Sequence, residues 1–134
     1  MGGDGLTERR SGRTILVVDD DEDIRRTLAA ILTRMQFRVL TAADGEEALK
    51  LCAKAEDIGF LLTDLIMPHM TGRMLADTIK ELYPDMRVIL MSGHIADGRA
   101  IRPEPGLRYL QKPVTGKMLA AAIAALMEAG FQEG

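Results

Sequence analysis

Short, nearly continuous apolar runs alternate along this chain with longer segments in which apolar residues recur every three or four positions. The runs cover residues 15–18, 60–63, 88–91 and 109–111, and a further short strand is predicted at 38–41. Apolar runs of this length are typical of parallel strands that are covered on both faces. The pattern therefore predicts five buried strands separated by helical segments.

The first two helical segments are predicted from apolar spacing and from a start signal. After the first run, apolar residues recur at i, i+4, i+7, i+8 and i+11, at positions Ile24, Leu28, Ile31, Leu32 and Met35. The acidic residues 21–23 fall in the first turn of this helix, where the helix dipole favours negative charge. Asp44 and Gly45 start a second helix, which runs to about Ala55.

Two of the later helical segments are clearly predicted, and a third is short. A helix after Gly72 is stopped by Pro84, and its apolar side is predicted to contain Met74, Leu75, Thr78, Ile79 and Leu82. The last helix, about 115–129, is predicted to bury Leu119, Ile123 and Leu126. Prolines and glycines limit any helix between the fourth and fifth strands to residues 95–101.

Alternation of strands and helices implies an α/β fold of (βα)5 type. Right-handed crossovers that place helices on both faces require a doubly wound parallel sheet. The simplest order of its strands is 2-1-3-4-5, the flavodoxin-like arrangement.

Composition indicates one ordinary globular domain of 134 residues with 47% apolar content. We expect a loose leader at 1–13, the folded domain at 14–130 and a short tail at 131–134. No apolar run approaches the roughly 20 residues of a membrane span and no secretory signal is visible, so we expect no membrane insertion and a cytoplasmic protein. A net charge of −3 argues against direct binding of nucleic acid. The single cysteine, Cys52, has the spacing of a packing residue on a helix face.

Polar side chains of different kinds follow four of the predicted strands. Asp19 and Asp20 follow the first, Asp64 ends the third, Ser92 follows the fourth and Lys112 follows the fifth. Open parallel sheets bind ligands at the carboxyl ends of their strands. We therefore expect these side chains to converge on one small pocket.

This set of groups suits a divalent cation and a phosphoryl group. The first turn lacks the glycines of a dinucleotide site, and carboxylates there would repel a phosphate unless a cation intervened. Asp19, Asp20 and Asp64 make a reasonable Mg²⁺ site, in which crowding should raise the pKa of at least one carboxyl when no metal is bound. Asp64 stands alone at the central strand and is the best candidate nucleophile, with Lys112 and Ser92 supplying charge and a hydroxyl.

Four motifs in this order resemble the receiver domain of two-component response regulators, over about residues 13–129. They are Ile15-Leu-Val-Val-Asp-Asp20, Leu62-Thr-Asp-Leu-Ile-Met-Pro68 with Gly72 after it, Val88-Ile-Leu-Met-Ser-Gly93 and Tyr109-Leu-Gln-Lys-Pro113. The resemblance implies that Asp64 is the phosphoacceptor and that Asp19 and Asp20 hold Mg²⁺. It also implies a metal-binding main-chain carbonyl at Ile66.

The same resemblance implies a conformational change after phosphoryl transfer. Lys112 would pair with the phosphoryl group, Ser92 would move onto it after transfer, and Tyr109 would then turn inward. The peptide bond before Pro113 is expected to be cis, which an X-Pro bond allows at small cost.

Partners and output follow from the resemblance as well. The phosphodonor would be a histidine kinase or a histidine phosphotransfer protein, and the domain would be a monomer or weak homodimer. It would not be an enzyme in isolation. The motifs around Ser92 and Lys112 resemble those of receivers fused to hybrid sensor kinases, in which case the parent chain would be a histidine kinase.

The main alternative is a phosphatase of the haloacid-dehalogenase type, with Asp19 as the nucleophile. Residues 19–21 contain its Asp-x-Asp pattern, and Ser92 and Lys112 could serve as its second and third motifs. That family needs a further acidic pair after the lysine, and the acidic residues available there are Glu128 and Glu133. A third hypothesis, an interaction module that works without phosphorylation, is disfavoured because every reactive position is filled.

Overall fold

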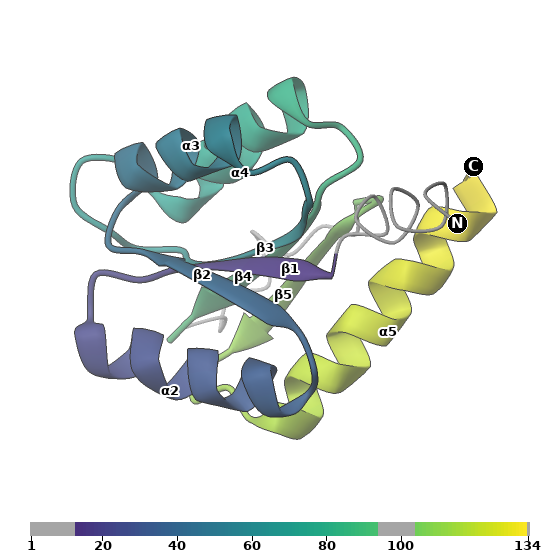
Figure 1. Ribbon diagram of the computed structural model, residues 1–134, viewed down its shortest axis with the longest axis horizontal. Coiled ribbons are helices and arrows are strands. Elements are labelled where there is room, and N and C mark those ends of the chain that lie inside the picture. The colour runs from purple at the N-terminus through teal and green to yellow at the C-terminus, as the bar shows by residue number, and fades with distance from the viewer. Residues whose placement is uncertain (1–12, 94–103, 134) are drawn as a thin grey trace.

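A computed structural model describes residues 13–93 and 104–133, and these form one parallel sheet with helices on both faces (Figure 1). The strand order is β2-β1-β3-β4-β5, as predicted. The strands are β1 (Thr14–Val18), β2 (Arg38–Ala42), β3 (Ile58–Asp64), β4 (Arg87–Ser92) and β5 (Leu107–Gln111). Every neighbouring pair is parallel, so all carboxyl ends share one edge.

The helices cover the sheet in two pairs. On one face lie α3 (Gly45–Lys54) and α4 (Gly72–Leu82), and on the other lie α2 (Glu22–Arg34) and α5 (Gly116–Glu133) (Figure 1). Of the expected leader at 1–13, only residue 13 is described, and the expected helix at 95–101 lies outside the described residues.

Each face of the sheet has its own apolar core, because successive side chains of a strand point to opposite faces. Leu16 and Leu61 pack beneath α3 and α4, whereas Ile15 and Phe60 pack beneath α2 and α5. Cys52 is buried in the first of these cores, as its helical spacing predicted. Burial raises the pKa of its thiol to about 11.

Several polar residues act as N-caps of the helices. Asp21 is the N-cap of α2 rather than a residue of its first turn, and its carboxylate accepts hydrogen bonds from the amides of Asp23 and Ile24. Asp44 caps α3 by accepting from the amide of Glu47. Thr71 caps α4 in the same way. These bonds satisfy amides that the helix itself leaves without partners.

Two predictions about helices were wrong in detail. The sheet-facing stripe of α4 consists of Leu75, Ala76 and Ile79, while Met74 and Leu82 are 53% and 58% exposed. The true stripe follows the i, i+1, i+4 spacing, which rotates these two apolar residues toward solvent. Helix α5 continues to Glu133, beyond the predicted end near 129, because no proline follows to stop it.

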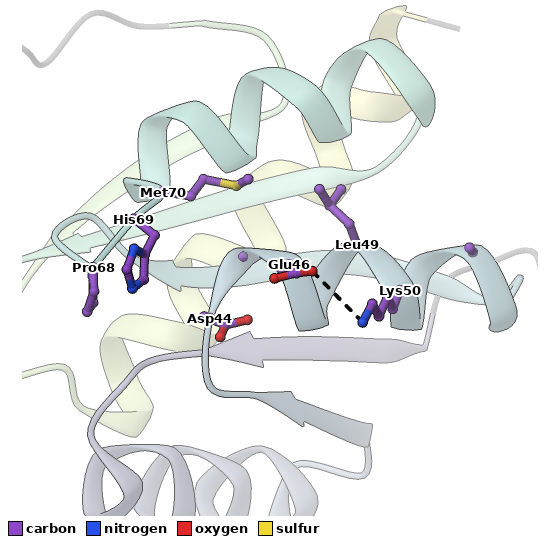
Figure 2. Close-up of a pocket in the computed structure, with 9 residues that line it drawn as sticks. Asp44, Glu46, Leu49, Lys50, Pro68, His69 and Met70 are labelled. Carbon is purple, nitrogen blue, oxygen red and sulfur yellow. Dashed lines mark ion pairs between the residues drawn. The ribbon is translucent and has the colours of Figure 1, made fainter.

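An open pocket lies on the α3 side of the molecule, between that helix and the loop that precedes α4 (Figure 2). Its lining includes Leu49 and Lys50 of α3 and residues 68–70 of the loop. His69 adopts a positive φ of 71° there. Within the described part of the chain, no helix is both long and apolar enough to cross a bilayer.

Candidate functional site

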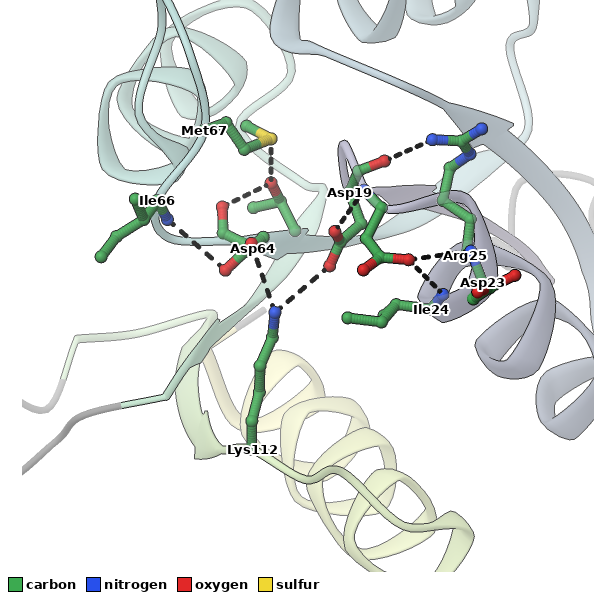
Figure 3. Close-up of polar contacts among 10 residues, drawn as sticks. Asp19, Asp23, Ile24, Arg25, Asp64, Ile66, Met67 and Lys112 are labelled. Carbon is green, nitrogen blue, oxygen red and sulfur yellow. Dashed lines mark hydrogen bonds and ion pairs between the residues drawn. The ribbon is translucent and has the colours of Figure 1, made fainter.

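Three of the predicted site residues meet at the carboxyl edge of the sheet (Figure 3). Asp19 follows β1, Asp64 ends β3, and Lys112 follows β5. The amine nitrogen Nζ of Lys112 lies 3.4 Å from Oδ2 of Asp19 and 3.3 Å from Oδ2 of Asp64. One cation therefore bridges two carboxylates that are 45 residues apart in the chain, as the strand-end argument predicted.

Asp19 is held rigidly and is almost completely buried, with 1% of its surface exposed. Its Oδ1 accepts a hydrogen bond from the amide of Asp21 at 2.9 Å. Its main-chain carbonyl accepts from Nη1 of Arg25 at 2.7 Å, and its amide donates to the carbonyl of Ala42 at 3.2 Å. Both carboxylate oxygens of Asp19 thus have fixed positions at the sheet edge.

Asp20 completes an acidic cluster with Asp19 and Asp64. One carboxylate oxygen from each residue lies within 4.8 Å of the others, and Asp20 is the exposed member. A small hard cation binds through one or two carboxylates together with water and phosphate oxygens. A cluster with two buried carboxylates and one facing solvent fits such an ion and leaves room for its remaining ligands.

Electrostatics at this site favour the arrival of a cation. Burial, assisted by the negative charge of Asp64, raises the pKa of Asp19 above its ordinary value. The expected rise is therefore present, but burial rather than charge crowding is its main cause. Burial acts to lower the pKa of Lys112, yet the carboxylates of Asp19 and Asp64 outweigh it and raise that pKa, so the amine is charged.

The main chain around Asp64 is fixed by short contacts on both sides. The amide of Leu65 donates to the carbonyl of Met91 at 2.8 Å, and the amide of Gly72 donates to the carbonyl of Leu65 at 2.8 Å. A Cβ on Gly72 would overlap the carbonyl oxygen of Asp64 and lie 2.9 Å from the Cα of Leu65. Only glycine allows α4 to begin this close to the end of β3.

Ile66 is the second residue of the loop after Asp64. Its amide is 3.4 Å from Oδ1 of Asp64, and its side chain is 73% exposed beside the site. Ile66 is thus held next to Asp64 by its main chain. Its apolar side chain lies beside the acidic cluster and faces solvent (Figure 3).

Ser92 ends β4 at the same edge, and Tyr109 is the middle residue of the neighbouring strand β5. Ser92 is buried, and its carbonyl accepts a hydrogen bond from the amide of Lys112 at 2.8 Å. Tyr109 pairs with Leu90 of β4 and is half-buried against the core under α3 and α4. The peptide bond between Lys112 and Pro113 is cis, as expected.

Two arginines near the site were missed by sequence reasoning. Arg25 holds the main chain of Asp19, and Arg73 donates to the hydroxyl of Tyr109 at 3.1 Å. The position of Arg25 in α2 gave a weak signal, because it is one helical turn after Asp21. Arg73 and Tyr109 are 36 residues apart, and no local pattern connects them.

Comparison with known proteins agrees with this geometry. A family profile described as response regulator receiver domain matches residues 15–124. The chemotaxis protein CheY homolog of Campylobacter jejuni subsp. jejuni serotype O:23/36 (strain 81-176) is 34% identical over 125 residues, which cover 90% of this chain and 96% of that protein. The sensor kinase CckA of Brucella abortus (strain 2308) is 27% identical over 125 residues, which cover 91% of this chain.

Solved structures give the same result. A crystal structure of a response regulator receiver domain protein from Clostridium thermocellum aligns with a TM-score of 0.80 at 31% identity, covering 90% of this chain and 98% of that one. The chain spans only 13% to 43% of the length of the first three curated relatives.

These matches do not support the haloacid-dehalogenase alternative. Receiver domains are signalling modules that take phosphoryl groups from histidine kinases and bind Mg²⁺ at an acidic pocket. With polar groups meeting from the ends of β1, β3 and β5 and a profile match across most of the sequence, the chain belongs to the family of response regulator receiver domains.

Proposed function

We propose that Asp64 is the phosphoacceptor of this receiver domain. The observation that carries the proposal is the position of Lys112, whose amine lies within 3.4 Å of the carboxylates of both Asp64 and Asp19. A fixed positive charge beside the reacting carboxylate compensates the negative charge of an incoming phosphoryl group, which is the main requirement for phosphoryl transfer. Asp19 is the less suitable nucleophile because it is 1% exposed, against 9% for Asp64, and its Oδ1 accepts a 2.9 Å hydrogen bond from a main-chain amide, whereas the corresponding contact of Asp64 is 3.4 Å long.

The transfer itself is a simple displacement. A carboxylate oxygen of Asp64 attacks the phosphorus atom of a phosphohistidine, an O–P bond forms, and the N–P bond to the imidazole breaks. The imidazole nitrogen leaves with the electron pair of that bond, and the product is an aspartyl phosphate. Lys112 stays charged throughout and holds an oxygen of the phosphoryl group.

Asp19 and Asp20 would hold Mg²⁺ together with Asp64 and the main-chain carbonyl of Ile66. The support is the acidic cluster, whose three carboxylate oxygens lie within 4.8 Å of one another. A bound Mg²⁺ supplies charge neutralisation between the carboxylates and the phosphoryl oxygens. It would also reverse the effect of burial on Asp19 by favouring the ionised carboxylate.

The proposed switch involves Ser92 and Tyr109. The new phosphoryl dianion attracts the hydroxyl of Ser92, and Tyr109 repacks in response. Shifting a population from 1:99 to 99:1 requires about 5.5 kcal/mol of differential stabilisation, more than the roughly 1 kcal/mol of one neutral hydrogen bond. The hydroxyl contact, the aromatic repacking and the binding of a partner must therefore act together.

The phosphodonor in this proposal is a histidine kinase or a histidine phosphotransfer protein. The match to a sensor kinase over 13% of its length supports a receiver that is part of, or works beside, a kinase chain, and the parent of a fused receiver would be a histidine kinase. The proposal includes a cytoplasmic location, no direct contact with nucleic acid, and a monomer or weak homodimer.

Mass spectrometry after exposure to Mg²⁺ and a small phosphodonor tests the proposal. The wild-type chain should gain about 80 Da, the mass of one phosphoryl group, and Asp64→Asn should abolish the gain. Asp19→Asn is the matched control, because it should retain a slower gain if Asp64 is the nucleophile. A gain that persists in Asp64→Asn and disappears in Asp19→Asn would overturn the assignment.

A further inference from the structure

The guanidinium group of Arg73 contacts one side chain of its own helix and two from β5 and the segment before it. Nη1 donates to the hydroxyl of Tyr109 at 3.1 Å, and Nη2 lies 2.9 Å from Oε2 of Glu104. Nε lies 3.3 Å from Oδ1 of Asp77, one turn further along α4. Each of the three nitrogens therefore has its own partner, and the orientation of the planar group is fixed.

The main chain of Arg73 is fixed by the phosphoacceptor segment. Arg73 is the second residue of α4, and the first, Gly72, packs directly on the carbonyl of Asp64. The amide of Gly72 also donates to the carbonyl of Leu65. A displacement of the main chain at Asp64 must therefore move the first turn of α4, and the guanidinium group moves with that turn.

Two of the three partners of Arg73 belong to β5, the last strand of the sheet, and to the segment before it. Tyr109 is in β5, which pairs only with β4 among the described strands. Glu104 precedes β5 and forms an isolated bridge with Leu107. The side chains of Arg73 and Glu104 are each 37% exposed, so this ion pair is accessible to a partner protein.

We propose that Arg73 is a positioning residue that transmits the phosphorylation state of Asp64 to Tyr109 and Glu104 at the β5 edge. The inference rests on the proposed function of Asp64 and adds a direct path through α4 to the route through Ser92. The path depends on the rigid planar fork of an arginine, because the three donors of a lysine ammonium rotate about one nitrogen and fix no single arrangement of partners.

The alternative explanation is that the contacts of Arg73 have a structural role alone. They would then hold α4 against β5 and would not change when Asp64 is phosphorylated. A purely structural role predicts that replacing Arg73 shifts the resting position of Tyr109. The change of Tyr109 on phosphorylation would then be the same as in the wild-type protein. A relay predicts that the response itself is lost. The two explanations are separated by a probe that reports on Tyr109 alone.

The sequence permits such a probe, because the chain has two tyrosines and no tryptophan. In a Tyr83→Phe background, fluorotyrosine labels only Tyr109, and its fluorine NMR signal can be recorded with and without Mg²⁺ and beryllium fluoride. Arg73→Met keeps the apolar stem and the helix propensity while removing the three donors. Arg26→Met is the matched control, because Arg26 forms an exposed i,i+4 pair on α2.

Arg73→Met is expected to shift the resting signal of Tyr109 and to reduce its response to beryllium fluoride at least twofold. Arg73→Lys should restore only part of the response, and Arg26→Met should match the background protein. In a double-mutant cycle with Tyr109→Phe, the unfolding equilibrium constant should deviate from additivity by roughly two- to tenfold, the range of one hydrogen bond.

A full response to beryllium fluoride in Arg73→Met would overturn the relay, whether or not the resting signal moves. The proposed function has a separate test in the mass gain at Asp64. If that gain occurs and Tyr109 in the background protein ignores beryllium fluoride, the relay fails alone. If the gain does not occur, both proposals fail.

Discussion

The amine of Lys112 lies 3.4 Å from the carboxylate of Asp19, although 93 residues separate the two in the chain. The parallel sheet brings them together, because β1 and β5 both end at the same edge and only β3 and β4 stand between them. Burial nevertheless disfavours the ionised form of the Asp19 carboxyl group. It raises the pKa of that group above its ordinary value even though the cation of Lys112 acts to lower it. The site therefore holds a carboxylate whose ionised form is opposed until a further positive charge arrives.

Replacing Asp19 with Asn should stabilise the metal-free protein at neutral pH by about 1 kcal/mol, as is common at strained functional sites. The folded pKa of Asp19 lies above its ordinary value of 3.8, so the native state binds more protons than the unfolded state in the pH range around and between these two pKa values. Native stability contributed by the protonated group is consequently lost as pH rises through the folded pKa. Urea unfolding in EDTA should show an Asn advantage that is absent near pH 3 and grows toward pH 7. An advantage that is constant with pH would contradict this account.

Magnesium ions should stabilise the wild-type protein against urea. At a concentration of about ten times Kd, the expected gain in unfolding free energy is about 1.4 kcal/mol. Asp20→Asn should remove most of this gain without lowering the stability measured in EDTA, because Asp20 is the exposed member of the cluster. Asp23→Asn is the control, since Asp23 is an exposed residue of the same acidic run outside the cluster. Equal gains in both variants would argue against a specific site.

Substituting Gly72 with Ala should cost roughly 3 kcal/mol, at the upper end for overpacking. The new Cβ would meet main-chain atoms of Asp64 and Leu65, which cannot rotate away as a flexible side chain can. Gly93→Ala provides the comparison, because a Cβ at Gly93 meets no atom within 4 Å. It should change stability by less than about 0.5 kcal/mol. Similar effects of the two substitutions in urea unfolding would show that α4 does not begin as tightly as described.

Adjacent apolar residues of α4 should differ sharply in their effect on stability. Leu75 is completely buried, and Leu75→Ala should cost roughly 2–5 kcal/mol. Met74 is 53% exposed, and Met74→Ala should stay within about 0.5 kcal/mol of wild type. Denaturant midpoints with a shared m-value measure both effects. A large loss for Met74→Ala would mean that this side chain is covered by another part of the protein.

The strand order and the convergence of Asp19, Asp64 and Lys112 were predictable from sequence, because both depend on strong patterns. Buried parallel strands read as apolar runs, and a polar residue at the end of such a run has few other places to go than the shared edge. The cis bond before Pro113 was available only through the family resemblance, since either isomer of an X-Pro bond costs little.

Other features depended on three-dimensional detail that sequence spacing does not contain. Met74 and Leu82 matched a helical stripe, but the sheet selects the stripe that includes the small residue Ala76, which permits close packing. The contact between Arg73 and Tyr109 depends on where α4 crosses the sheet. The pKa of Asp19 depends on its depth of burial, which the acidic run alone could not indicate.

The burial of Cys52 has a practical consequence for experiments on this protein. A thiol with a pKa of about 11 has almost no thiolate at neutral pH, and it is enclosed by the core under α3. Because the sequence contains no other cysteine, one introduced at an exposed position such as Ile66 would be the only thiol that reacts quickly with a maleimide dye. Single-site fluorescent reporters can thus be built on the native background without first removing a cysteine from its core.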